Sequence, residues 1–143
     1  MKNNKGFTLI EILAAVTIMG ILAGVAVPAV MRYVDKSRKQ SYEAMEKSLY
    51  DAAKNYVMNE EIDIPSTGNV LSASDLMNEK YLERLEDPVD KGNSCTGSVE
   101  IEPDTATTDA NSFNSYTYYV SLKCVKYIVN DIEYTDNGRK QKK

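Results

Sequence analysis

The chain has 143 residues, no histidine and a formal net charge of −4 at pH 7. Without histidine the commonest general base and the commonest metal ligand are missing, so neither an enzyme nor a cofactor site is expected. Beyond Met31 the chain has 20 acidic and 15 basic residues, and this acidic balance disfavours binding to nucleic-acid phosphates, which depends on clustered Lys and Arg.

An uncharged segment of 20 residues runs from Ile12 to Met31. A helix of this length rises about 30 Å, the hydrocarbon thickness of a bilayer, so the segment predicts a membrane-spanning helix. A secretory signal peptide is the alternative, because the start is basic and small residues such as Ala23 and Ala26 suit a signal peptidase. Glu11 disfavours it, since a carboxylate beside hydrocarbon is costly and a targeting segment does not need one.

Basic residues flank this segment on both sides. Two precede it and four follow it: Lys2, Lys5, Arg32, Lys36, Arg38 and Lys39. Counting positive charges alone predicts that the C-terminal side stays in the cytoplasm.

The N-terminal segment resembles the prepilin N-terminus of type IV pilins and of the pseudopilins of type II secretion and competence. The resemblance rests on the string KGFTLIE at residues 5–11 and the apolar run after it. It implies cleavage between Gly6 and Phe7 by a membrane prepilin peptidase, N-methylation of Phe7, and a head outside the cytoplasm, against the charge count. Outside this segment the chain matches no particular pilin.

The resemblance also implies an assembly role for this segment, with Thr8 among the residues involved. In the family, Glu11 of one subunit pairs with the Phe7 amine of a neighbour in an apolar filament core. Either charge would be expensive to bury alone, so the pair favours the correct axial stagger. The alternative is a carboxylate that only reaches back to the membrane surface near Lys5.

Helix-disfavouring residues interrupt the apolar run at Gly20, Gly24 and Pro28. In a soluble helix interior they would cost about 1, 1 and 3 kcal/mol relative to alanine. Membrane helices carry them more often, where they allow close packing or a kink. The resemblance implies that this stretch loosens when the subunit enters a filament.

After Met31 the pattern stays helical to about Glu60 but becomes amphipathic, which predicts one stripe facing a small head. The stripe positions are Val34, Ser41, Met45, Leu49, Ala52 and Tyr56. A capping box at residues 72–75 predicts a short second helix that stops before Asp87.

Alternating patterns predict strands in the C-terminal half. Odd positions share an apolar face over residues 95–101, and even positions do so over residues 116–124. The polar tract 103–115 between them is expected to be an exposed loop. The segment 128–134 predicts a further strand pair about a turn at residues 130–131.

The two cysteines test the register of the strand pair. If Cys95 faces Cys124 in an antiparallel pair, Val99 faces Val120 and the buried faces agree. Opposed Cα atoms then lie about 4.5 to 5.5 Å apart, within reach of a disulfide. We predict this bridge, worth about 3 to 4 kcal/mol, and hence an oxidising compartment. Two reduced, buried thiols are the alternative.

Two weaker signals have ordinary alternatives. Asp87, Asp90 and Asn93 are spaced like calcium ligands, but this run lacks a full ligand set and simple turn chemistry is the favoured explanation. The basic tail 136–143 suits an anionic surface, but a solvated, flexible terminus is the simpler expectation.

The expected fold is therefore α+β and pilin-like, with a long N-terminal helix packed on a small antiparallel sheet. Residues 1–6 are the expected leader, 7–31 the transmembrane and assembly helix, 32–135 the head with the amphipathic half of the helix, and 136–143 a flexible tail.

The expected function is that of a structural subunit in a type IV pilus or pilus-like filament. Its expected partners are further copies of itself, the prepilin peptidase and methyltransferase, an assembly-platform membrane protein, minor pilins and the membrane, with no nucleic acid. The subunit is expected to cross the cytoplasmic membrane once before assembly and to lie in a surface filament afterwards. A secretion or competence pseudopilin and a secreted binding domain with a signal peptide are the alternatives.

Overall fold

The computed structural model describes residues 6–62, 64–103, 116–135 and 138–140. The chain forms two compact units, Met1–Lys39 and Gln40–Lys143. The helices and strands are α1 (Leu9–Asn59), β1 (Asn69–Ser72), α2 (Ala73–Asn78), β2 (Thr96–Pro103), β3 (Tyr116–Lys123), β4 (Ile128–Thr135) and β5 (Gly138–Lys140).

The first unit consists of the N-terminal part of α1. Its side chains from Gly6 to Lys39 are all exposed, including the apolar ones. By length and composition this part of α1 is able to cross a membrane. A helix that is apolar on every side and has no protein around it requires an apolar environment from outside the chain.

The helix continues through the residues that disfavour helices in water. Pro28 lies inside α1, and a Cβ atom added at Gly20 or Gly24 would meet nothing within 4 Å. Packing within the described chain therefore gives no reason for glycine at these two positions. Close approach by another helix is such a reason. The loosening of this stretch in a filament stays a prediction.

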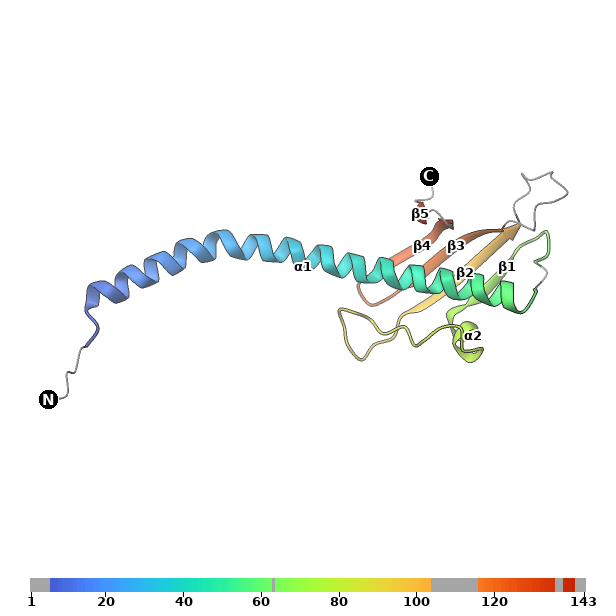
Figure 1. The fold of residues 1–143 in the computed structure, drawn as a ribbon, viewed down its shortest axis with the longest axis horizontal. Helices are drawn as coiled ribbons and strands as arrows, with labels where there is room; N and C mark the ends of the chain where they lie inside the picture. Colours follow the sequence, from blue (N-terminus) through green and yellow to red (C-terminus); the bar gives the residue numbers. More distant parts are fainter. Residues whose placement is uncertain (1–5, 63, 104–115, 136–137, 141–143) are drawn as a thin grey trace. The chain divides into compact units, whose positions relative to one another are not determined.

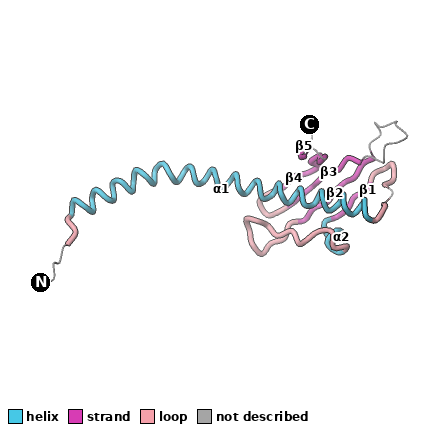
Figure 2. Tube along the Cα trace, in the orientation of Figure 1, coloured by secondary structure: helices cyan, strands magenta, loops and turns pink. Residues whose placement is uncertain are grey.

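The second unit is a five-stranded antiparallel sheet with the last part of α1 laid along one face, as Figure 1 shows. The strands follow one another in chain order from β1 to β5. A long loop joins α2 to β2 (Figure 2). The predicted α+β class, with a long N-terminal helix and a small antiparallel sheet, is confirmed.

The core of this unit lies between α1 and the inner face of the sheet. Gly97 of β2 marks a close approach of the sheet to α1, because a Cβ atom there would lie 2.7 Å from Leu49 Cδ2 and 3.0 Å from the Ser121 carbonyl oxygen. The most deeply buried apolar side chains are Leu49, Ala53, Leu76, Val99, Ile101, Val120 and Leu122.

The register of β2 and β3 is the one that the alternating pattern predicts. Val99 pairs with Val120, and Ile101 pairs with Tyr118. All four side chains are buried. A shift by one residue would move every one of them to the solvent face, so burial specifies this register strongly.

The predicted turn at residues 130–131 was wrong, because residues 128–135 form the single strand β4. The register shifts between Val120 and Leu122, where β4 holds one more residue than β3. Asp131 has a positive φ of 52°, and its N–H donates to Ser121 Oγ at 2.9 Å. The turn-favouring residues therefore produce a β-bulge.

The predicted flexible tail was wrong for Gly138–Lys140, which form β5 against β4. Arg139 holds this strand through contacts with α1 that are described below. The other tail residues lie outside the described part of the chain. Most of the predicted loop 103–115 does so too, and its first residue, Pro103, ends β2.

The predicted extent of α1 was correct, but α2 is shorter than predicted, because it ends at Asn78 and not just before Asp87, and the predicted face of α1 was partly wrong. Helix α1 ends at Asn59, and Ser72 caps α2 with the predicted capping box. Of the predicted stripe, Val34 and Ser41 are exposed and Leu49 and Ala52 are buried. The buried stripe of α1 is Tyr42, Glu46, Leu49, Tyr50, Ala52, Ala53 and Val57. Because the charged residue Glu46 lies within this stripe, the hydrophobic pattern of the sequence did not reveal it.

Candidate functional site

The N-terminus of α1 is closed by a reciprocal pair of residues. The Thr8 N–H and hydroxyl both donate to Glu11 Oε2 at 2.8 Å, and the Glu11 N–H points at Thr8 Oγ1 at 3.4 Å. This is the geometry of a capping box, in which each side chain satisfies an end of the helix that lacks an internal partner. The sequence order Thr-Leu-Ile-Glu therefore determines where the helix begins.

The predicted cleavage point lies just before this cap. Gly6 and Phe7 precede the helix, and Phe7 is 85% exposed. A peptidase needs its substrate backbone free of helical hydrogen bonds, and the peptide between these two residues meets that condition.

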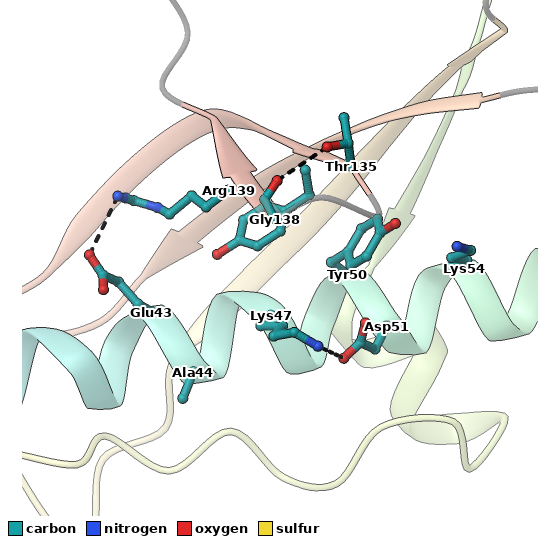
Figure 3. Close-up of a pocket in the computed structure, with 10 residues that line it drawn as sticks. Glu43, Ala44, Lys47, Tyr50, Asp51, Lys54, Thr135, Gly138 and Arg139 are labelled. Atoms are coloured by element: carbon teal, nitrogen blue, oxygen red, sulfur yellow. Dashed lines mark hydrogen bonds and ion pairs between the residues drawn. The ribbon is translucent and has the colours of Figure 1, made fainter.

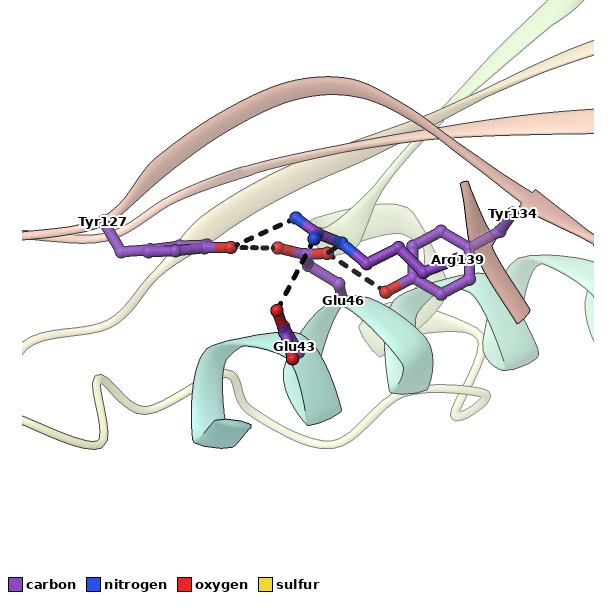
Figure 4. Close-up of polar contacts among 5 residues, drawn as sticks. All are labelled: Glu43, Glu46, Tyr127, Tyr134 and Arg139. Atoms are coloured by element: carbon purple, nitrogen blue, oxygen red, sulfur yellow. Dashed lines mark hydrogen bonds and ion pairs between the residues drawn. The ribbon is translucent and has the colours of Figure 1, made fainter. Parts of the chain in front are cut away.

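A second polar centre lies inside the head, where Glu46 of α1 is fully buried. Tyr127 donates to its Oε1 at 2.6 Å, and Tyr134 donates to its Oε2 at 3.0 Å. Arg139 Nε donates to Oε2 at 2.9 Å, while Arg139 Nη1 lies 3.5 Å from Glu43 Oε1. Figure 4 shows these side chains meeting at the carboxylate: Glu43 comes from α1, Tyr127 from just before β4, Tyr134 from β4 and Arg139 from β5.

The two tyrosines of this centre remain neutral donors. Burial raises the pKa of Tyr127, and its hydrogen bond to Glu46 raises it further. Burial and the charge of Glu46 likewise raise the pKa of Tyr134. The arrangement pairs one buried carboxylate with one guanidinium and satisfies it further with two hydroxyl donors, which is the condition under which a buried ion pair is tolerated.

Glu46 and Arg139 were not predicted to have a role. Glu46 lies four residues after Tyr42 and three before Leu49, so its place on the buried stripe was a usable signal. Arg139 offered no such signal, because its partner lies 93 residues earlier in the chain.

A shallow groove of about 380 Å³ lies beside this centre, between α1 and the C-terminal strands (Figure 3). Its charges are largely joined in pairs. Lys47 and Asp51 lie 2.9 Å apart, and Arg139 pairs with Glu43. The groove consequently has no strong charge of one sign to select a ligand.

The predicted cysteine pair lies at one end of the strand pair. The structure joins Cys95 and Cys124 by a disulfide, with their Cα atoms 4.4 Å apart, and both residues are buried. An Asp87 carboxylate oxygen lies within 4.8 Å of both sulfur atoms. Because the sulfur atoms are bonded to each other, this cluster is not a thiolate metal site.

Asp87 ties three parts of the head together. Its Oδ1 accepts from the Tyr42 hydroxyl at 2.9 Å and from the Val89 and Asp90 N–H groups, and its Oδ2 accepts from the Val125 N–H at 3.1 Å. Asn93 contributes through its backbone, accepting from the Asp87 N–H at 2.9 Å. These contacts are turn chemistry, and the calcium alternative stays a prediction.

The contacts of Asp87 lead to a prediction about acid stability. Burial alone would raise its pKa, but the bonds from Val89, Tyr42, Asp90 and Val125 outweigh burial and hold the pKa below its usual value. The ionised form therefore stabilises the head at pH above about 4, and this contribution is lost as pH falls through the depressed pKa. We expect Asp87→Asn to lower the free energy of unfolding at pH 7 by about 1 to 3 kcal/mol.

Chemical unfolding of both proteins in detergent, at a series of pH values, checks this expectation. The difference between Asp87→Asn and the parent should shrink below about pH 4. Glu86→Gln, at the exposed neighbouring position, is the control and should resemble the parent throughout. A difference that stays constant down to pH 2 would refute the charge-based explanation.

Comparisons with known proteins agree with the N-terminal geometry. The prokaryotic N-terminal methylation motif matches residues 1–27. The type IV major alpha-pilin of Moraxella bovis is 43% identical over 68 residues, covering 43% of this chain and 43% of that protein. The type IV major pilin protein PilA of Myxococcus xanthus is 40% identical over 53 residues, covering 37% of this chain and 24% of that protein.

A third relative is fimbrial protein Q of Moraxella bovis, which is 50% identical over 38 residues, covering 27% of this chain and 24% of that protein. The chain thus spans less than half the length of each of these curated relatives. The comparison with solved structures found no match. The methylation motif over residues 1–27 and the pilin relatives support a type IV pilin family, and the long helix with its antiparallel sheet is consistent with a pilin fold.

Proposed function

We propose that the chain is the structural subunit of a type IV pilus or pilus-like filament and that it polymerises through the N-terminal part of α1. One observation carries this proposal: a methylation motif opens an exposed, uncharged helical segment whose start holds a single carboxylate, Glu11. A membrane before assembly, and neighbouring copies after it, are the two environments that cover such a surface.

The stages of this pathway are part of the proposal. A prepilin peptidase cuts between Gly6 and Phe7 and the new amine is methylated. The subunit waits in the cytoplasmic membrane with its head outside, and an assembly platform and minor pilins move it into the filament. Glu11 then gives up its contact with Thr8 and pairs with the methylated amine of a neighbouring subunit. This pairing favours the correct axial stagger of the subunits.

The relatives favour a pilus over the two alternatives. Their printed names are major pilin and fimbrial protein, which supports a pilus rather than a secretion or competence pseudopilin. The methylation motif over residues 1–27 disfavours a secreted domain with an ordinary signal peptide. The proposed role is structural and involves no catalysis.

The first test is the N-terminal mass of the protein in cell envelopes and in material sheared from the cell surface. A mature protein that starts at an N-methylated Phe7 supports the proposal. A start just after Ala26 would reveal a cleaved signal peptide and overturn it.

Gly6→Val should leave an uncleaved precursor in the membrane, because a branched side chain at the cleavage point blocks access to the peptide bond. Immunoblotting of membrane fractions would show a single, slower band. Gly20→Val, the same change at a glycine inside α1, is the control and should be cleaved normally. Normal cleavage of Gly6→Val would remove the prepilin peptidase from the proposed pathway.

A further inference from the structure

A basic patch follows the apolar segment within the first unit. We define the basic collar as Arg32, Lys36, Arg38 and Lys39. Residues 32–39 hold these four basic residues and one acidic one, whereas residues 40–143 hold 11 basic and 19 acidic residues. All residues of the collar are exposed.

The proposed orientation of the subunit makes this collar unexpected. Positive residues next to a membrane span are enriched on the cytoplasmic side. With the head outside the cytoplasm, the collar lies on the outer side of the membrane. The enrichment of positive residues on the cytoplasmic side therefore does not explain it. Neither cleavage nor the pairing of Glu11 involves the collar, so it requires an explanation of its own.

The spacing of the collar places its charges at the membrane surface. Arg32, Lys36 and Lys39 are four and three residues apart, so they share one face of α1. At 1.5 Å per residue, Lys36 lies about 6 Å and Lys39 about 10 Å beyond Arg32. The headgroup layer on each side of a bilayer is about 5 to 7 Å thick.

Side-chain direction brings the farther charges back toward that layer. In an α-helix the Cα–Cβ bonds tilt toward the N-terminus, which for α1 is the direction of the membrane. The long aliphatic stems of Lys36 and Lys39 therefore let their ammonium groups reach the headgroups. Tyr33, which is 74% exposed, lies at the same level, where aromatic residues commonly mark the membrane interface.

The single acidic residue of this stretch does not cancel the collar. Asp35 lies 3.6 Å from Arg38, and both side chains are largely exposed. The stretch 32–39 keeps a net charge of +3. An anionic surface attracts this stretch and repels the acidic head. Of these two regions, only the collar is therefore expected to bind such a surface.

We propose that the basic collar binds the headgroups of anionic phospholipids on the outer face of the cytoplasmic membrane and so fixes the depth of the waiting subunit. This inference rests on the proposed membrane stage. The partner is a lipid rather than the acidic head of another copy, because the collar begins directly where the uncharged segment ends. Its contacts with the headgroups need no partner protein.

The test uses the full chain reconstituted in bilayers of phosphatidylcholine with a trace of spin-labelled lipid. We expect spin-labelled phosphatidylglycerol to associate with the protein about threefold or more strongly than spin-labelled phosphatidylcholine. Raising the salt from 0.1 M to 1 M shortens the screening length from about 10 Å to about 3 Å and should abolish the preference.

A variant of the collar and a charge-matched control locate the effect. Arg32→Gln, Lys36→Gln and Lys39→Gln together should reduce the preference to near one. Lys91→Gln, Lys123→Gln and Lys126→Gln remove the same charge from exposed positions of the head and should leave it unchanged.

The possible results separate this inference from the proposed function. If the parent chain fails to insert into bilayers, the proposed membrane stage itself is wrong. If it inserts but shows no preference for phosphatidylglycerol, or if the collar variant keeps the preference, only the lipid proposal is overturned. A collar variant that keeps the preference yet loses filaments would assign the collar to contacts between subunits.

Discussion

Replacing Glu11 with alanine should leave cleavage after Gly6 intact and abolish filaments. In the proposed filament core the neighbour's amine would remain as a buried charge without a partner, and breaking a buried pair in this way costs about 3 to 5 kcal/mol per contact. That corresponds to roughly a hundredfold or greater loss in the association constant at each subunit contact. Electron microscopy and the yield of sheared protein measure the loss, and the N-terminal mass confirms cleavage.

Two further variants separate the charge of Glu11 from its capping role. Glu11→Gln keeps an oxygen that accepts from Thr8 but removes the charge, so it should also fail to assemble. Thr8→Val keeps the charge and removes the hydroxyl that contacts Glu11 Oε2. Losing such a cap costs about 1 kcal/mol, so filaments should persist with reduced yield. Normal filaments from Glu11→Gln would show that stagger does not depend on the carboxylate charge.

Replacing Arg139 with alanine should destabilise the head by about 3 to 5 kcal/mol, because it leaves the fully buried Glu46 without its positive partner. Two tyrosine hydroxyls would remain as donors, and neither carries a charge. Chemical unfolding of the full chain in detergent, followed by near-ultraviolet circular dichroism of the tyrosines, measures the change. The effect is large for a residue four positions from Lys143.

The neighbouring residue supplies the matched control. Lys140 forms a surface pair with Glu133 at 3.3 Å, and exposed pairs contribute about 0 to 1 kcal/mol. Lys140→Ala should therefore have little effect. Adding Glu46→Gln to Arg139→Ala removes the uncompensated charge and should recover part of the lost stability. A loss below 1 kcal/mol for Arg139→Ala, or no recovery in the double variant, would contradict the proposed role of the ion pair.

The two polar centres have different roles, one between subunits and one within the head. Glu11 belongs to the first unit and, in the proposed function, acts between subunits. Glu46 belongs to the second unit and, through Tyr127, Tyr134 and Arg139, ties the C-terminal strands to α1. We expect loss of Glu11 to spare the head and loss of Arg139 to spare processing at the N-terminus.

The sequence alone determined the elements whose signals are local or periodic. The uncharged run to Met31 predicted a long helix, and the capping box at Ser72 predicted the start of α2. Alternation predicted the register that pairs Val99 with Val120, because side chains in a strand alternate between two faces and only one register buries both apolar sets. The motif at residues 5–11 gave the resemblance to type IV pilins.

Only the tertiary structure decided how the C-terminal part of the head closes. Residues 130–131 have the composition of a turn, yet pairing along β3 makes them a bulge within β4. Glu46 is a residue type that usually faces solvent, and Arg139 lies in a polar segment that has the composition of a frayed end. They meet inside the protein because β4, β5 and α1 bring together groups 93 residues apart in the chain. Burial of a charge depends on partners from distant segments, and no local pattern records which segments those are.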